Sequence, residues 1–127
     1  MSKPPIISII DDDESVRDAV GDLVSSLGFD ARVFASAEDF LSSADYPLTV
    51  CVITDMQMPG MSGQDLQHKL VAEGQLIPMI FITAFPEART RDSVMAKGAL
   101  AFLEKPFDGR VLSQLIRHVT AAAGPAA

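Results

Sequence analysis

Cysteine and basic residues are scarce in this chain, and each shortage excludes some classes of function. The single cysteine, Cys51, lies in an apolar run, so we expect a buried thiol and no internal disulfide. The chain has 10 Lys and Arg residues against 17 Asp and Glu, and this net charge of -7 disfavours non-specific binding to nucleic acid or anionic membranes. No apolar run approaches the ~20 residues that span a bilayer, and the first residues lack the pattern of a signal peptide. We therefore expect a protein of a reducing, cytoplasmic compartment without a membrane partner.

What the sequence does contain is an alternation of apolar runs and amphipathic helical patterns, which is typical of a parallel sheet with helices between its strands. The apolar runs predict strands at residues 6–10, 31–34, 49–54, 79–83 and 100–103. The helical patterns predict helices at residues 15–27, from Ser36, at 63–73, at 89–97 and from about Asp108, with Val71 and Val111 among the buried positions. Residues 1–120 are long enough for one domain with its own core, and the small residues at 121–127 are interpreted as a frayed tail or the start of a linker.

Three consecutive acids, Asp11, Asp12 and Asp13, follow the first apolar run. In an open α/β sheet the ligand site lies at the carboxyl ends of the strands. Adjacent carboxylates repel one another, and a hard divalent cation such as Mg²⁺ would relieve that repulsion. The acids therefore predict a metal site. A cluster of negative charge at the start of a helix is the simpler alternative, and it suits Asp13 and Glu14.

Further polar residues fall at the ends of other predicted strands. Asp55 follows the third strand, Thr83 closes the fourth and Lys105 comes just after the fifth. Because the carboxyl ends of parallel strands share one edge of the sheet, these side chains should converge with the acids of the first strand. A carboxylate can attack phosphorus, Mg²⁺ and a lysine can offset the charge of a phosphoryl group, and a hydroxyl can bond its oxygens. Taken singly, Asp55 suits a turn and Thr83 an ordinary strand end, so the prediction of a phosphoryl site depends on their joint order.

Four short stretches carry a resemblance to a known family: I-I-D-D at 9–12, D-M-Q-M-P-G-M-S-G at 55–63, I-T-A at 82–84 and K-P-F at 105–107. In this order they resemble the receiver domain of two-component response regulators, and the likeness extends over residues 6–119. The stretch F-L-E-K-P-F at 102–107 is similar to receivers of FixJ-like transcription regulators. The resemblance implies a flavodoxin-like α/β fold, with a five-stranded parallel sheet in the order 2-1-3-4-5 and helices on both faces.

The resemblance also implies what the acidic site does. Asp55 would accept a phosphoryl group from the phosphohistidine of a sensor histidine kinase, in a reaction that needs Mg²⁺. The metal, or Mn²⁺ in its place, would be held by Asp11, Asp12, Asp55 and the backbone carbonyl of Gln57. The chain would then be a signalling domain, an enzyme only in the sense that it catalyses its own phosphorylation and dephosphorylation.

Thr83 and Lys105 would, by the same resemblance, bind the phosphoryl group, and Phe102 would be the aromatic side chain that turns inward as Thr83 moves. An ordinary core aromatic is the alternative for Phe102. The resemblance places a partner or homodimer surface on the fourth helix, the fifth strand and the fifth helix. No basic helix-turn-helix occurs in the chain, so we expect no nucleic-acid binding by these residues, and any DNA-binding domain would lie beyond Ala127.

Two rival functions remain open from the sequence. The motif Asp11-x-Asp13-x-Ser15 also resembles the nucleophile motif of haloacid-dehalogenase-type phosphatases, in which Asp11 would be the attacking residue. Against an enzyme of that kind, no acidic pair follows Lys105 and no cap insertion is present. A receiver-shaped scaffold that never takes phosphate is the other rival, and the intact set of acids, threonine and lysine disfavours it.

Overall fold

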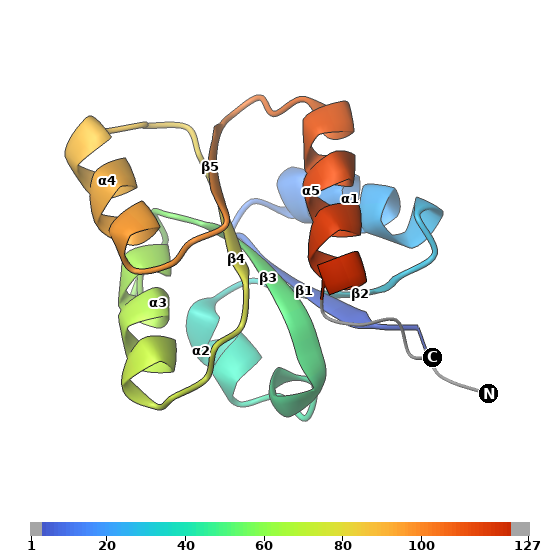
Figure 1. The fold of residues 1–127 in the computed structure, drawn as a ribbon, viewed down its shortest axis with the longest axis horizontal. Helices are drawn as coiled ribbons and strands as arrows, with labels where there is room; N and C mark the ends of the chain where they lie inside the picture. Colours follow the sequence, from blue (N-terminus) through green and yellow to red (C-terminus); the bar gives the residue numbers. More distant parts are fainter. Residues whose placement is uncertain (1–3, 123–127) are drawn as a thin grey trace.

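Residues 4–122 are described by the structure, a computed structural model, and they form a five-stranded parallel sheet between two layers of helices (Figure 1). The strands are β1 (Ile6–Ile10), β2 (Asp30–Phe34), β3 (Thr49–Asp55), β4 (Met79–Thr83) and β5 (Ala101–Glu104). They lie in the order β2-β1-β3-β4-β5, and all neighbouring pairs are parallel. The predicted flavodoxin-like sheet order is therefore confirmed.

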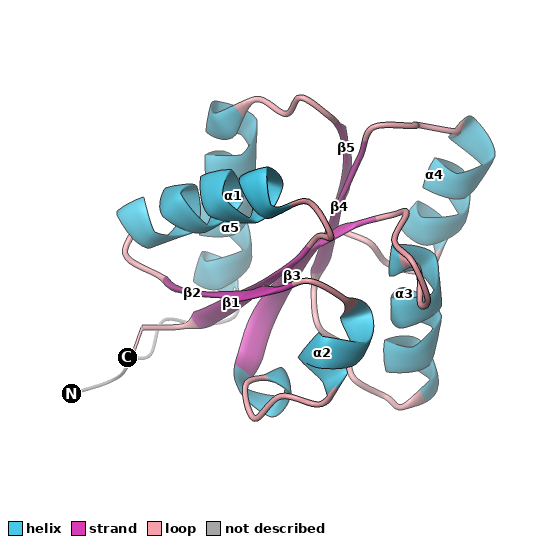
Figure 2. Cartoon of the chain, turned by 180° about the vertical axis from the view of Figure 1, so that it is seen from behind, coloured by secondary structure: helices cyan, strands magenta, loops and turns pink. Residues whose placement is uncertain are grey.

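The helices divide between the two faces of the sheet, as Figures 1 and 2 show from opposite sides. Helices α1 (Glu14–Ser26) and α5 (Gly109–Ala122) cover one face. Helices α2 (Ala37–Leu41), α3 (Gly63–Ala72) and α4 (Ala88–Ala96) cover the other. None of these helices, within residues 4–122, is long and apolar enough to cross a membrane.

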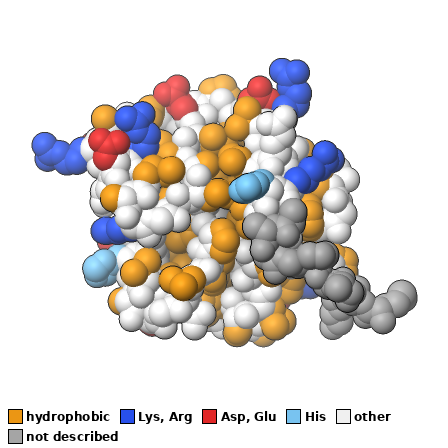
Figure 3. All heavy atoms as spheres, in the orientation of Figure 1, with side chains coloured by type: hydrophobic (Ala, Val, Ile, Leu, Met, Phe, Trp, Pro, Cys, Tyr) orange, Lys and Arg blue, Asp and Glu red, His pale blue; other side chains and the backbone are white. Residues whose placement is uncertain are grey.

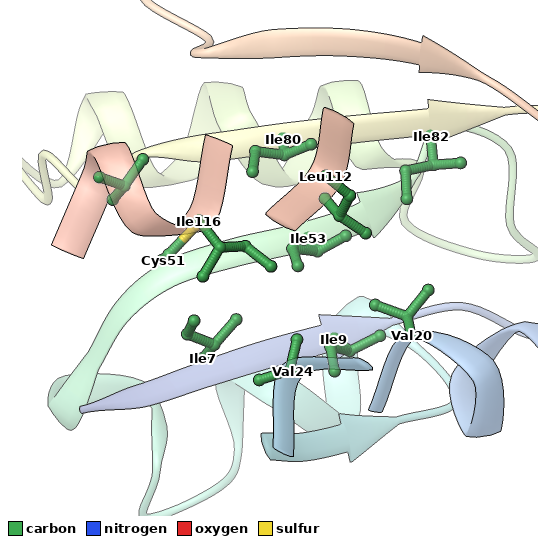
Figure 4. Packing of buried hydrophobic residues seen from close by; sticks show 11 residues of the cluster. Ile7, Ile9, Val20, Val24, Cys51, Ile53, Ile80, Ile82, Leu112 and Ile116 are labelled. Carbon is green, nitrogen blue, oxygen red and sulfur yellow. The ribbon is translucent and has the colours of Figure 1, made fainter. Parts of the chain in front are cut away.

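The sheet separates two hydrophobic cores, because helices cover both of its faces and strand side chains alternate between them. The core under α1 and α5 combines strand residues with helix residues (Figure 4): Ile7, Ile9, Cys51, Ile53, Ile80 and Ile82 with Val20, Val24, Leu112 and Ile116. The opposite core contains Val52, Phe81, Phe40, Leu66 and Leu70. The prediction that Cys51 is buried is confirmed, since its exposed fraction is 0%.

Side-chain caps fix where three of the helices begin. The Asp13 carboxylate accepts the N–H of Ser15 at the start of α1, and Ser36 accepts the N–H of Asp39 at the start of α2, as the sequence predicts. Ser62 and Asp65 form a reciprocal capping box at the start of α3. These bonds satisfy N–H groups that a helix start would otherwise leave without partners.

Helix α4 is attached to the body more weakly than its neighbours. Val94 is its one fully buried side chain, and Glu87, the residue before the helix, makes no capping hydrogen bond. Two hydrogen bonds tie it to α3: Gln67 Nε2 donates to the Val94 carbonyl at 2.9 Å, and Gln64 Nε2 donates to Ser93 Oγ at 3.2 Å. Few buried apolar contacts are typical of the parts of a fold that open most easily.

Some details of the sequence analysis were wrong. Val71 and Val111 are 48% and 41% exposed, because each lies at the edge of its helix's buried stripe and not within it. A short 3₁₀ helix at Tyr46–Leu48, which the sequence analysis did not predict, leads into β3. Helix α5 continues through Ala122, two residues into the expected tail, and the rest of that tail lies outside the described residues.

Candidate functional site

Three carboxylates meet at the carboxyl edge of the sheet. Asp11 follows β1, Asp12 comes next, and Asp55 is the last residue of β3. One oxygen from each lies within 4.8 Å of the others. Asp11 and Asp55 are only 2% and 7% exposed, while Asp12 is open to solvent. Parallel pairing of β1 with β3 brings the two strand ends together although 44 positions separate their numbers (55 minus 11).

Lys105, which follows β5, supplies the countercharge. Its Nζ lies 2.9 Å from Asp11 Oδ2 and 3.3 Å from Asp55 Oδ2, so one ammonium bridges two buried carboxylates. The Lys105 backbone N–H also donates to the Thr83 carbonyl at 2.7 Å, which fixes this residue to the end of β4. The structure therefore brings together Asp11, Asp12, Asp55 and Lys105, as the sequence predicts.

Burial and charge act in opposite directions on the titration of this cluster. Burial raises the pKa of the Asp11 carboxyl above its usual value, and the nearby charge of Asp55 adds to the rise. Hydrogen bonds from the Asp13 N–H and from Lys105 only partly offset it. Burial also works against the Lys105 ammonium, but its bonds and attraction to Asp11 and Asp55 outweigh that, so the pKa of Lys105 is raised. Desolvation disfavours the charged form of these carboxylates, and one lysine does not fully neutralise them. The cluster is therefore well suited to bind a further cation.

The donor set suits a hard divalent ion. Mg²⁺ and Mn²⁺ favour carboxylate and carbonyl oxygens, and the mutually close oxygens of Asp11, Asp12 and Asp55 supply them. Beside them lies an open hollow of about 350 Å³, lined by Asp12, Asp13, Asp55, Gln57, Ala84, Phe85 and Lys105. Gln57 donates its backbone N–H to Asp55 Oδ1 at 3.3 Å. The residues present therefore fit Mg²⁺, with room beside it for a small anionic group.

Asp13 lines the same hollow but has another task. Its Oδ1 accepts both the N–H and the hydroxyl of Ser15, at 2.9 and 2.7 Å, and these bonds lower the pKa of the Asp13 carboxyl. It does not belong to the group of mutually close carboxylates. The simpler interpretation of Asp13, a charge that caps α1, is the one this geometry favours.

Thr83 and Phe102 lie on the α4 side of the sheet. Thr83 is fully buried, and its Oγ1 accepts the N–H of Phe85 at 3.1 Å. Its neighbour in β4, Ile82, pairs with Asp55, so Thr83 stands one residue beyond the acidic end of β3. Phe102 pairs with Phe81 two residues earlier on β4, which places it on the same face as Thr83. Phe102 is half-buried and lies outside the acidic hollow, beside a separate cavity of about 250 Å³ next to Arg91 and Glu104.

Three contacts around the site were missed by the sequence analysis. Arg17 Nη1 donates to the Asp11 carbonyl at 2.8 Å. Glu38 Oε2, from α2, accepts the N–H of Met61 at 3.0 Å and so holds the loop after Asp55. Gly63 lies so close to the Asp55 carbonyl that a Cβ atom there would be 2.4 Å from it. Only the last had a signal in the sequence, a glycine at the end of the stretch 55–63.

Comparisons with known proteins define the class to which this fold and site belong. Residues 7–117 match the model of the response regulator receiver domain. The chain belongs to the response regulator receiver domain family of two-component systems. The predicted family is thus confirmed, and the phosphatase alternative is not favoured.

Individual relatives agree with the family assignment. The chain is 37% identical to the transcriptional regulatory protein TdiR of Thauera aromatica over 116 residues, which cover 91% of this chain and 51% of TdiR. It is 34% identical to the transcriptional regulatory protein FixJ of Bradyrhizobium diazoefficiens over 121 residues, covering 95% and 59%. The chain therefore spans about half the length of these curated relatives.

Solved structures show the same fold. A response regulator receiver protein from Pseudoalteromonas atlantica superposes with a TM-score of 0.87 at 29% identity, covering 94% of this chain and 99% of that one. The structure titled FixJ-N gives a TM-score of 0.80 at 30% identity, covering 100% and 99%.

Proposed function

We propose that this receiver domain accepts a phosphoryl group on Asp55 from the phosphohistidine of a sensor histidine kinase. One observation carries the proposal: the Asp55 carboxylate lies at the edge of an open hollow, among two further carboxylates and within 3.3 Å of the Lys105 ammonium. Such a site offers a nucleophile and charge compensation side by side. The cytoplasm, where kinase domains meet their receivers, is the compartment we propose.

The transfer exchanges one bond to phosphorus for another. An Asp55 carboxylate oxygen attacks phosphorus, the new P–O bond forms and the P–N bond of the phosphohistidine breaks. The electron pair of that bond leaves with the imidazole nitrogen, which then takes a proton. The product is an acyl phosphate, and attack by water on its phosphorus returns Asp55 and inorganic phosphate.

Mg²⁺, or Mn²⁺, would be held by Asp11, Asp12, Asp55 and the backbone carbonyl of Gln57. When bound, the ion supplies charge compensation for the phosphoryl oxygens and for the clustered carboxylates. Lys105 would move from its carboxylate partners toward a phosphoryl oxygen. Two unit charges ~4 Å apart interact by ~4 kcal/mol at an effective dielectric of ~20, so the lysine is worth orders of magnitude in rate.

Thr83 and Phe102 would report the modification to the surface. The Thr83 hydroxyl would exchange its bond with the Phe85 N–H for one to a phosphoryl oxygen, and Phe102 would turn toward the space so freed. Both residues lie on the α4 side of the sheet, so the change would reach the face made by α4, β5 and α5. Figure 3 shows that face toward the viewer, with hydrophobic side chains gathered between α4 and α5. We propose that phosphorylation switches partner binding or homodimerisation there.

Intact-mass measurement tests the phosphoacceptor. Wild-type protein incubated with acetyl phosphate and Mg²⁺ should gain the mass of one phosphoryl group, and Asp55→Asn should gain none. The position of the adduct separates the proposal from the phosphatase alternative, because a haloacid-dehalogenase-type mechanism would attach the group to Asp11. Borohydride reduction followed by peptide mapping then identifies the modified residue. Equal adducts on wild type and Asp55→Asn would refute the assignment.

Sedimentation tests the switch surface. Beryllofluoride with Mg²⁺ should raise the dimer fraction of the wild type, and Val111→Arg, on α5, should abolish the rise because it puts a charge in an apolar interface. Val71→Arg is the matched control, since Val71 is similarly exposed but lies on α3. A response that survives Val111→Arg but is lost in Val71→Arg would place the interface elsewhere.

A further inference from the structure

Arg17 makes a contact that the proposed roles of the acidic site do not use. Its Nη1 donates a 2.8 Å hydrogen bond to the backbone carbonyl of Asp11, six residues earlier. The residue is half-buried and lies in the first turns of α1. The dipole of a helix disfavours a cation near its amino end, so helix electrostatics do not account for an arginine at this position.

The guanidinium group is also not neutralising a carboxylate. Asp13, Glu14 and Asp18 are all near it in sequence, yet the ion pairs within residues 4–122 do not include Arg17. It donates instead to a carbonyl oxygen of the loop between β1 and α1. A planar guanidinium holds an acceptor in a more defined direction than a lysine ammonium can.

The residue that this hydrogen bond constrains is Asp12. The Asp11 carbonyl belongs to the peptide that joins Asp11 to Asp12. Because a peptide is planar, a hydrogen bond that holds this oxygen also holds the backbone nitrogen and Cα of Asp12. Asp11 has other restraints: its N–H donates to the Phe34 carbonyl, its Oδ1 accepts the Asp13 N–H and its Oδ2 pairs with Lys105. The exposed Asp12 carboxylate has no hydrogen-bond partner within the described part of the chain. The position of Asp12 beside Asp11 and Asp55 thus depends on its two flanking peptides, the first held by Arg17 and the second by the bond from the Asp13 N–H to Asp11 Oδ1.

We propose that Arg17 is a positioning residue for divalent-cation binding, which acts by holding the peptide that presents Asp12 to the metal. The proposal rests on the proposed function of the site, in which Asp12 is a metal ligand. Residues that orient a metal ligand typically change metal affinity by 10–100-fold when they are removed. Arg17 should therefore matter for metal affinity far more than for the chemical step at saturating metal.

Direct titration with Mn²⁺, followed by electron paramagnetic resonance, tests the proposal without any turnover. Arg17→Ala should weaken Mn²⁺ binding by about 10-fold. Arg117→Ala, on α5, removes the same charge from an exposed position and should leave the affinity within about two-fold of wild type. Arg17→Lys keeps the positive charge but lacks the planar guanidinium group, so its Mn²⁺ affinity should lie between those of Arg17→Ala and wild type. Should Arg17→Ala not fold, as judged by circular dichroism, Arg17→Lys carries the test with a several-fold weakening.

Phosphorylation by acetyl phosphate, measured against Mg²⁺ concentration, provides the second readout. The Arg17→Ala protein should need about 10-fold more Mg²⁺ for half-maximal rate and reach nearly the wild-type rate at saturation. Unchanged Mn²⁺ affinity in folded Arg17→Ala, or equal weakening by Arg117→Ala, would overturn the proposal. A wild type that binds Mn²⁺ but takes no phosphoryl group would instead contradict the proposed function and leave the role of Arg17 standing.

Discussion

Gly63, the first residue of α3, has no room for a side chain, and the substitution Gly63→Ala tests how tightly α3 is packed against β3, the strand that ends at Asp55. A Cβ atom at this position would lie 2.4 Å from the carbonyl oxygen of Asp55 and 3.1 Å from the Cα of Met56. Both are backbone atoms, so neither can rotate away as the end of a side chain could. The backbone itself must therefore move.

The expected magnitude follows from these distances. A relaxed carbon–oxygen contact is about 3.3–3.6 Å, so the start of α3 and the end of β3 must separate by roughly 1 Å. Overpacking of this kind costs ~1–3 kcal/mol. With a urea m value of ~2 kcal/mol/M, the midpoint of unfolding should fall by about 1 M. The displacement falls on Asp55, so phosphorylation by acetyl phosphate should slow by ~10–100-fold, since a shift of 1 Å at reacting groups can have that effect.

Gly109→Ala is the matched control. Gly109 is the first residue of α5, as Gly63 is of α3, but the nearest atom to an added Cβ would be Leu23 Cδ2 at 4.0 Å. The substitution removes freedom from the unfolded chain without a clash and should stabilise the protein by ~0.4–1 kcal/mol. Urea unfolding followed by circular dichroism measures both variants. Equal midpoints for wild type and Gly63→Ala, or shifts of the same sign in both variants, would refute the reasoning.

Three further predictions concern buried groups and α4. Burial raises the pKa of the Cys51 thiol to about 12, so iodoacetamide at pH 8 should modify the folded protein ~1000-fold more slowly than the urea-unfolded protein. Because the pKa of this thiol is near 9 in the unfolded chain, the free energy of unfolding should also fall by ~1.4 kcal/mol per pH unit above pH 9. Urea titrations at several pH values measure this slope, which Cys51→Ala should lack. The raised pKa of Asp11 means that the folded state holds this proton more tightly than the unfolded state, so the stabilising contribution of the protonated group is lost as pH rises above about 4. In EDTA, Asp11→Asn should therefore gain stability relative to wild type as pH rises above about 4, and a constant difference would contradict this. Backbone amides of α4 should exchange with deuterium faster than those of α3 or α5, as mass spectrometry can show, and slower exchange in α4 would count against its weak attachment.

The sequence predicted most strands and helices because their signals are local, whereas the order of the strands in the sheet came from the family resemblance. The three inner strands β1, β3 and β4 are mostly apolar because helices bury both of their faces, whereas the edge strand β2 carries Asp30 and Arg32. Gly28, Ser36 and Ser62 mark where helices end or begin. The acidic cluster and Lys105 were predictable for a related reason. The carboxyl ends of parallel strands lie at one edge of the sheet, so residues that directly follow the strands are close together in space.

What the sequence did not predict depends on distances between elements. The bond from Arg17 to the Asp11 carbonyl follows from how α1 turns over the end of β1, and no periodicity reports that angle. The Glu38 contact with the Met61 N–H crosses from α2 to the loop after β3. Val71 and Val111 were assigned to buried faces because helical periodicity tolerates an error of one position, and each lies at the edge of its helix's buried stripe.

The weak packing of α4 determines how little free energy a signal needs to displace this helix. A helix anchored by one valine and two side-chain amides can be displaced for a few kcal/mol, the scale of losing a single large buried side chain. One new charged contact near the strand ends supplies energy of that same scale. A single covalent modification would therefore suffice to shift α4, while the isoleucine-rich core under α1 and α5 would hold the rest of the sheet in place.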